Sequence, residues 1–504
     1  MHRLIACLIA LSLAHVPLAA RSQPMTMDQI EAAFAAGDHD TARAGLASLI
    51  SDAPSPQAQF RYGRMLLEGL GGAADPVEGL RLLRAAADAG QLGAVTYLGR
   101  VHLTAGPTRD PERAARYFHH AAARGVAEAK YYLGILTRDG VGVPQDAASA
   151  LTWMQAAAED GYGPAQFELS KHLADATPPD LAQAARWLTE AANAGVPDAQ
   201  FALAREVQAQ GGPIAQVIAL FTDAATDGHV PSQRALGTLY LTGAEGQAPD
   251  GVQAEAWLRR AVQGRDLVAL HNLGMGYLQG TVLPSAPEQA VELLTLASDN
   301  GFARSSLALA RAYEDGTASA PDMATALQHY RLAVDQGSDA AARRLGALIL
   351  DGATKPRVPP HDAVPWVLAR LQADGEARAR DWLVARAAEG VRPAQAGLGA
   401  WLLTQPDGAV TARPLLQAAA DRGHVPSQFR LGEAYTTGLF GDVDYVAAHG
   451  WLNIAAASGH IRATQMRDTI TDLMTPDDIA AAQSVTRAFF EAARTQPPVP
   501  TVSE

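Results

Sequence analysis

Residues 129–161 read AKYYLGILTRDGVGVPQDAASALTWMQAAAEDG, and this stretch decides the fold. Its first half carries Leu-Gly at Gly134 and ends at Gly140, which suits a left-handed helix C-cap. Its second half opens at Asp146, a residue type that begins helices, and places Trp153 eight residues before the closing glycine. Leu and Gly in the first half let a neighbouring helix approach closely. The stretch therefore predicts two helices joined by a short loop.

The closing phrase, Ala-Ala shortly before a Gly, recurs along most of the chain. Its glycines are Gly90, Gly125, Gly161, Gly195, Gly228, Gly264, Gly301, Gly337, Gly390, Gly423 and Gly459. Neighbouring copies are 33 to 37 residues apart, except for one spacing of 53. Neither helix of a unit can bury its apolar face alone, so the units must stack. The period predicts an all-α, right-handed α-solenoid of about eleven units, with a concave and a convex face.

The repeated positions resemble those of a known family. The first helix often continues from Leu-Gly to Tyr and Gly, as at Gly274 with Tyr277 and Gly280. A large residue that fills the core precedes the closing glycine by eight positions; its tryptophans are Trp153, Trp187, Trp382 and Trp451. These features resemble the Sel-one-like repeat family of the tetratricopeptide-like superfamily. The resemblance implies a scaffold or adaptor that binds other proteins.

The spacing, the resemblance and the N-terminal residues together predict the domain organisation. The expected segments are a signal peptide at 1–22, an N-terminal helical hairpin cap at 27–54, regular repeats at 57–337, an irregular repeat with an insertion at 338–390, further repeats at 391–459, a C-terminal helical cap at 460–495 and a flexible tail at 496–504. The irregular repeat contains either a long loop or an extra helix. Its second helix is expected around Trp382, and a change in curvature is expected here.

The N-terminus has the order of a secretory signal peptide. His2 and Arg3 precede an apolar run from Leu4 to about Leu18 that closes on Ala20, so cleavage after residue 20 or 22 is expected. Cys7, the one cysteine, opens the apolar run, whereas a lipoprotein cysteine follows it, so the sequence disfavours a lipoprotein. No later stretch is apolar for long enough to span a membrane. The sequence thus predicts an exported bacterial member of the family in the periplasm, without disulfides.

Composition and motifs exclude several classes of function. The chain has 504 residues, is 48% hydrophobic and has a net charge of -13, which argues against disorder and against a nucleic-acid binder dominated by phosphate contacts. The 14 histidines form no catalytic motif, and His119 and His120 diverge by about 100° on a helix. We expect no catalytic residue, metal or cofactor. The oligomeric state is not indicated.

The resemblance to tetratricopeptide-like units implies that the first helices line the concave groove, so we aligned these helices on Leu-Gly. The residues after the glycine are Arg64, Arg100, Ile135, Lys171, Arg205, Thr238, Met275, Arg311, Ala347, Ala400 and Glu433; five of these eleven are basic, where the composition predicts about one. Aromatic residues stand one turn earlier, at Phe60, Tyr131, Phe167, Phe201 and Phe429. The candidate partner-binding residues are Phe60, Arg64, Arg100, Tyr131, Phe167, Lys171, Phe201, Arg205 and Arg311.

Two interpretations of this ladder stay open. Cations and aromatics on one face suit an acidic peptide or an anionic polymer. Alternatively, the cations pair with Glu68, Asp175 and Asp315, four residues further on, while the aromatics pack between repeats. The first hypothesis for function is a non-catalytic adaptor of the bacterial envelope that binds a protein or peptide segment. The alternative is recognition of an anionic envelope polysaccharide in an assembly or export complex, and a cell-wall-active enzyme comes third.

Overall fold

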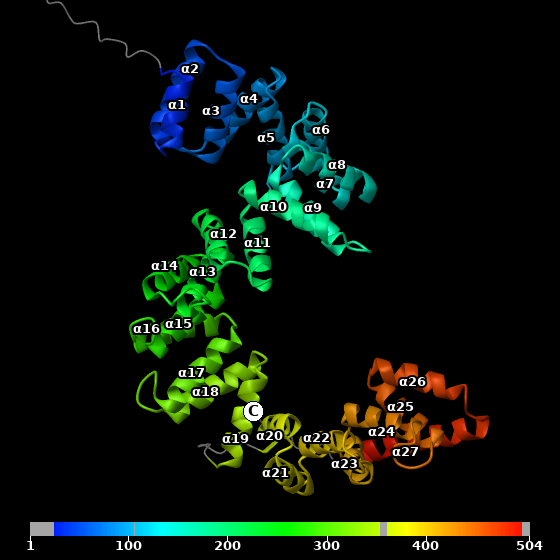
Figure 1. The fold of residues 1–504 in the computed structure, drawn as a ribbon. Helices are drawn as coiled ribbons and strands as arrows, with labels where there is room; N and C mark the ends of the chain where they lie inside the picture. The colour runs from blue at the N-terminus through cyan, green and yellow to red at the C-terminus, as the bar shows by residue number, and fades with distance from the viewer. Residues whose placement is uncertain (1–24, 105, 353–359, 496–504) are drawn as a thin grey trace, which may run out of the picture. The chain divides into compact units, whose positions relative to one another are not determined.

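The computed structural model describes residues 25–104, 106–352 and 360–495. The predicted signal peptide, with Cys7, and the predicted tail at 496–504 lie outside these residues. All regular elements of the described residues are α-helices, with one isolated β-bridge between Ala244 and Gln247 (Figure 1). None of these helices is both long and apolar enough to cross a membrane. The predicted all-α repeat fold is confirmed.

The chain divides into two compact units, Met1–Ser232 and Gln233–Glu504, and each is described by itself. The first unit contains α1 (Met27–Ala35), α2 (His39–Asp52), α3 (Pro56–Glu68), α4 (Pro76–Asp88), α5 (Leu92–Leu103), α6 (Pro111–Ala122), α7 (Ala127–Asp139), α8 (Ala147–Glu159), α9 (Gly163–Asp175), α10 (Leu181–Asn193), α11 (Pro197–Ala209) and α12 (Ile214–Thr226). Helix α13 (Val230–Thr242) contains the boundary between the units.

The second unit continues with the remaining helices. They are α14 (Gly251–Gln263), α15 (Leu267–Gln279), α16 (Pro287–Asp299), α17 (Ala303–Asp315), α18 (Met323–Asp335), α19 (Asp339–Leu350), α20 (Pro360–Asp374), α21 (Ala377–Ala388), α22 (Arg392–Leu402), α23 (Ala409–Asp421), α24 (Val425–Thr436), α25 (Tyr445–Ala457), α26 (Ile461–Thr471) and α27 (Pro476–Thr495). Within each unit, a first helix packs on its second helix, which packs on the first helix of the next repeat.

Local chemistry sets the helix ends as the sequence predicts. The Asp75 carboxylate accepts a hydrogen bond from the Glu78 backbone N–H at 3.1 Å and caps α4, and Asp146 caps α8 in the same way. Gly140 ends α7 with φ of 68°, and Gly280 ends α15 with φ of 62°. Glycine adopts this left-handed conformation without the steric cost that a Cβ brings. These repeats thus carry their own start and stop signals.

The repeat-locked tryptophans contribute to the core. Trp451 is 8% exposed within a cluster that includes Leu416, Leu431 and Leu452. Trp153 is half-buried against the cluster around Phe118. Burying such aromatic surface is a large favourable contribution to folding. The predicted core-filling role of these positions is confirmed.

The interval of 53 residues contains an additional helix. We expected the second helix of this unit around Trp382, but α19 packs on α20: Gly346 of α19 lies against the backbone carbonyl of Trp366. Trp382 lies on α21, which shares a buried core with α20 and α22 through Val367, Leu383 and similar residues. The extra helix, one of the two predicted alternatives, is therefore present. The predicted pairing is wrong: α21 has the sequence features of a second helix, but the helix that packs on α19 is the one whose backbone Gly346 approaches.

Both ends of the array contain extra helices. Helix α2 packs on both α1 and α3. At the other end α27 folds back onto α25, where the Thr486 hydroxyl lies 3.4 Å from the Gly450 carbonyl oxygen that can accept its hydrogen bond. These pairs cover the apolar faces that the terminal repeats would otherwise expose.

A set of buried glutamines links successive repeats. Four of them donate a hydrogen bond from Nε2 to the carbonyl eight residues earlier, near the end of the preceding helix: Gln166 to Ala158, Gln200 to Ala192, Gln395 to Ala387 and Gln428 to Ala420, at 3.0 to 3.3 Å. The last carbonyls of a helix lack intrahelical hydrogen-bond donors, and these side-chain amides supply one donor to each helix end. Each glutamine follows a proline by two or three residues, which is the sequence signal for this contact.

Candidate partner-binding surface

The first helices of the first unit present the predicted cations at equivalent places. Arg64 lies on α3, Arg100 on α5, Lys171 on α9 and Arg205 on α11. Arg100, Lys171 and Arg205 are exposed, and Arg64 is half-buried. The equivalent residue on α7 is Ile135, which packs against an apolar cluster. The first unit therefore carries four cations over five successive first helices.

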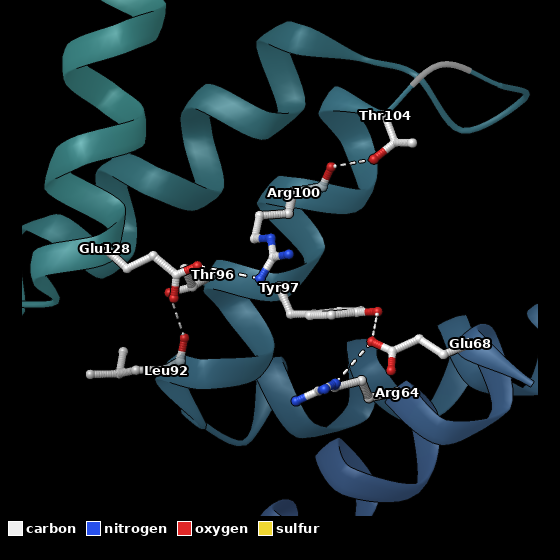
Figure 2. A network of polar contacts seen from close by, with 8 residues as sticks. All are labelled: Arg64, Glu68, Leu92, Thr96, Tyr97, Arg100, Thr104 and Glu128. Carbon is white, nitrogen blue, oxygen red and sulfur yellow. Dashed lines mark hydrogen bonds and ion pairs between the residues drawn. The ribbon is translucent and has the colours of Figure 1, made fainter. Parts of the chain in front are cut away.

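Tyr97 connects two of these cations. Its ring lies between the guanidinium groups of Arg64 and Arg100, which are 6.0 and 5.7 Å from the ring centroid (Figure 2). Its hydroxyl donates a hydrogen bond to Glu68 Oε1 at 2.8 Å, and Arg64 Nε donates to the same oxygen at 2.9 Å. A guanidinium over an aromatic face is attracted by the negative face of the ring. α3 and α5 are thereby joined at the surface.

The chain of contacts extends to α7. Arg100 Nη1 lies 3.5 Å from Glu128 Oε1, and the Thr104 hydroxyl donates to the Arg100 carbonyl at 3.1 Å (Figure 2). Arg64, Tyr97, Arg100 and the two carboxylates form what we call the Tyr97 cluster. Because the ion pairs are partly exposed, each contributes little to stability and can exchange partners.

Tyr97 should ionise only at strongly alkaline pH. Burial and the hydrogen bond to Glu68 raise the pKa of Tyr97 to about 12 from the ordinary 10.0. Because the folded pKa is the higher one, the stability linked to the neutral phenol is present below pH 10 and is lost as pH rises through about 12. Ultraviolet titration of the wild type and of Tyr97→Phe gives two curves, and their difference should show the ionisation of Tyr97 near pH 12. A difference step near pH 10 would contradict the prediction.

The remaining cations differ in their pairing. Lys171 Nζ lies 2.6 Å from Glu168 Oε1 and 4.8 Å from the Phe167 ring centroid. It does not pair with Asp175. Arg205 makes no ion pair or hydrogen bond through its side chain within the described residues. Of the three predicted i,i+4 pairs, the structure contains the one between Arg64 and Glu68, while Arg311 and Asp315 remain apart.

The predicted aromatic residues pack between repeats. Tyr131 lies against Tyr162, Phe201 against His229 and Phe429 against His460, with ring centroids 4.4 to 5.4 Å apart. Phe60 lies edge-on to Tyr97 at 6.3 Å, and Phe167 packs against the cluster around Ala191. In three of these pairs, the partner ring belongs to the residue just before the next first helix. The aromatic residues therefore join repeats, and the cations other than Arg64 are exposed.

An apolar pocket adjoins Arg64. Its volume is about 330 Å³, and it lies between α1, α2 and α3. The apolar lining comes from Met27, Ile30, Phe34, Leu46 and Met65.

The rim of this pocket is charged. Arg61 Nη2 lies 3.2 Å from Glu31 Oε1 across the opening, and Arg64 also lines the pocket. An apolar cavity with a few polar groups at its edge is typical of binding sites. The sequence did not predict Tyr97 or this pocket, which we call the cap pocket. Tyr97 precedes Arg100 by three residues, so its position on the same face was the available signal.

The described residues contain no group of three or more His, Cys, Asp or Glu placed to hold a metal. The charged groups of the surface are instead arginines, a lysine and their carboxylate partners. Such groups recognise charge and shape. The surface is suited to binding.

Comparison with known proteins identifies the repeats. Sel1 repeats match at residues 56–91, 94–126, 127–162, 163–196, 230–266, 267–302, 303–338 and 425–460, more than half of the chain. The chain belongs to the Sel1 repeat family. Sel1 repeats generally mediate protein–protein interaction and are generally non-catalytic. No match covers residues 339–424, which include the additional helix.

Two solved structures are similar to this chain, and the first of them shows the same fold. A protective antigen of uropathogenic Escherichia coli strains that displays an SLR fold is 24% identical, with a TM-score of 0.52 over 91% of this chain and 99% of that one. A Sel1 repeat protein from Oxalobacter formigenes is 27% identical, with a TM-score of 0.41 over 47% of this chain and all of that one.

Curated relatives match a short part of this Sel1 protein. DAP3-binding cell death enhancer 1 of Rattus norvegicus is 38% identical over 88 residues, which are 18% of this chain and 17% of the relative. Its Mus musculus counterpart is 37% identical over 105 residues, 20% of each protein. This chain thus covers no more than a fifth of these relatives.

Proposed function

We propose that this protein is a non-catalytic adaptor that holds an acidic segment of a partner protein on the first-helix face of its first unit. The observation that carries the proposal is the placement of Arg64, Arg100, Lys171 and Arg205 at one repeat position, with the cap pocket beside the first of them. A segment that follows successive first helices would meet a cation on most of them. An apolar side chain of the segment would fill the cap pocket.

The carboxylates on this face set the strength and specificity of binding. Glu68, Glu128 and Glu168 neutralise three of the four cations in the free protein. A partner carboxylate must displace them, so each contact gains little, while Arg205 is available without competition. Exposed charge pairs govern association rate and salt dependence more than affinity. We therefore expect binding that weakens steeply as salt rises.

The place of action is proposed on the sequence of the N-terminus. The order of His2, Arg3, an apolar run and Ala20 supports export across a bacterial inner membrane. The adaptor would then meet its partner in the periplasm. The residues concerned lie outside those that the structure describes.

Charge reversal at three cations should abolish partner binding. The partner is first identified by photo-crosslinking in cells from a reactive group at exposed Thr104, beside Arg100. Binding to that partner is then measured for the triple variant Arg64→Glu, Arg100→Glu and Arg205→Glu. We expect at least a tenfold loss, because each reversal replaces attraction by repulsion.

The matched control carries the same change of charge elsewhere in the first unit. Arg84, Arg116 and Arg124 lie on or directly after α4 and α6, outside the first-helix face. Their reversal to Glu should leave affinity within about twofold. Equal binding by the two triple variants would reject the proposal, and so would crosslinks to an anionic polysaccharide alone.

A further inference from the structure

A second pocket lies in the second unit, between the first helices α15 and α17. Its volume is about 530 Å³. The lining includes Met275 and Leu278 of α15 and Leu307 of α17, all half-buried. Arg304 and Arg311 of α17 also line it. The pocket therefore combines an apolar floor with two guanidinium groups.

The two arginines are open to an external anion. Both are exposed, and within the described residues neither side chain forms an ion pair. Asp315, one turn beyond Arg311, is turned to its own loop: its Oδ1 accepts hydrogen bonds from the Thr317 N–H at 3.0 Å and from the Thr317 hydroxyl at 2.8 Å. The arginines are seven residues apart on one helix face, which separates their backbones by about 10 Å.

The imidazole of His271 forms an uncharged part of the pocket wall. Burial and the nearby Arg304 lower its pKa from the ordinary 6.5, so the ring is uncharged at neutral pH. Its Nδ1 lies 3.1 Å from Ser305 Oγ, and its ring packs edge-on against Phe302 at 5.5 Å. With the ring held in this way, the charged groups that line the pocket are Arg304, Arg311 and Asp315.

We propose that this pocket is a second docking site, for a peptide segment that carries an apolar side chain between two carboxylates about 10 Å apart. Each guanidinium can bind a carboxylate through two parallel hydrogen bonds. In a peptide with polyproline II geometry, which has three residues per turn, two acidic residues three positions apart lie on one face and span about 9 Å. The apolar side chain between them occupies the floor formed by Met275, Leu278 and Leu307.

This inference goes beyond the adaptor function of the first unit. It gives the chain a separate site on a different compact unit, with its own requirement for charge spacing. A protein with two such sites can hold two segments, of one partner or of two. Engagement of both sites by one partner would raise the overall affinity by linkage alone.

The test is a peptide selection on the full-length protein. A displayed library of random short peptides is selected in parallel on the wild type, on Arg304→Glu with Arg311→Glu, and on Arg430→Glu. Arg430 is an exposed arginine of α24 in the same unit, outside the pocket, and serves as the control. We expect one group of peptides, with paired acidic residues around an apolar one, that the double variant fails to select.

Peptides from that group are then measured by fluorescence anisotropy. Their affinity should fall at least tenfold for the double variant, fall less for Arg304→Lys with Arg311→Lys, and stay within about twofold for Arg430→Glu. Equal selection by the wild type and the double variant overturns the inference. Selected peptides that lose affinity on charge reversal of Arg64, Arg100 and Arg205 bind to the first unit instead. Failure of the pocket in the second unit is thereby distinguishable from failure of the surface on the first unit.

Discussion

Replacing Gln428 with Glu should destabilise the second unit by about 3 to 4 kcal/mol at pH 7 and much less at pH 4. Gln428 is 1% exposed, and its Nε2 donates to the Ala420 carbonyl at 3.0 Å, near the end of α23. A carboxylate has no proton to donate and would sit, desolvated, at the negative end of that helix. It would regain the contact by binding a proton, so its pKa must rise above the ordinary value.

The pH dependence follows from this direction. The folded pKa is raised, so stability is retained below the unfolded pKa of about 4.3 and lost as pH rises through the folded one. Urea unfolding at pH 4 and pH 7 measures the free energy of unfolding on either side of this transition. Hydrogen exchange of α23 to α25 shows whether the loss lies in these helices. Gln465→Glu, at an exposed position of α26, is the control and should change stability by less than about 0.5 kcal/mol. Equal stability of Gln428→Glu at the two pH values would contradict the prediction.

The sequence predicts well what depends on neighbouring residues. Asp75 and Gly140 act as helix caps because a side chain or a φ angle decides the outcome locally. The repeat period then predicts stacking, because every unit exposes the same apolar face. Pairing across the interval of 53 residues is different, since α20 and α21 both offer an apolar face to α19. Contact between Gly346 and the Trp366 backbone selects α20, and no local pattern marks that contact.

In the candidate site, too, the sequence predicts local features and not contacts between side chains. Repeat alignment predicts the positions of Arg64, Arg100 and Lys171 on equivalent places of first helices. It does not predict their partners, because Lys171 reaches back three residues to Glu168 although Asp175 lies an equally plausible four residues ahead. Side-chain direction decides between such candidates. The cap pocket also escaped prediction, because its lining comes from three helices with no common period.

Replacing Gly63 with Ala should destabilise the first unit by about 2 kcal/mol, although Ala is the better helix former. Gly63 of α3 and Gly79 of α4 face each other: a Cβ on Gly63 would lie 2.8 Å from the Gly79 carbonyl oxygen and 3.0 Å from Leu83 Cγ. In a free helix, Ala would gain about 0.5 to 1 kcal/mol over Gly. Here the added carbon meets backbone and a fully buried leucine, and overpacking of this kind costs about 1 to 3 kcal/mol.

Gly450→Ala is the control that separates the steric cost of the added Cβ from the higher helix propensity of Ala. Gly450 is also helical, but an added Cβ would meet the side chain of Val485 at 3.2 Å, and that valine is 42% exposed and can move. This substitution should be neutral or slightly stabilising in urea unfolding, whereas Gly63→Ala should lower the midpoint. A stabilising Gly63→Ala would show that α3 and α4 separate easily. Because α3 also carries Arg64 and Met65, its displacement should weaken binding at the cap pocket, so one methyl group tests whether close helix packing positions the proposed site.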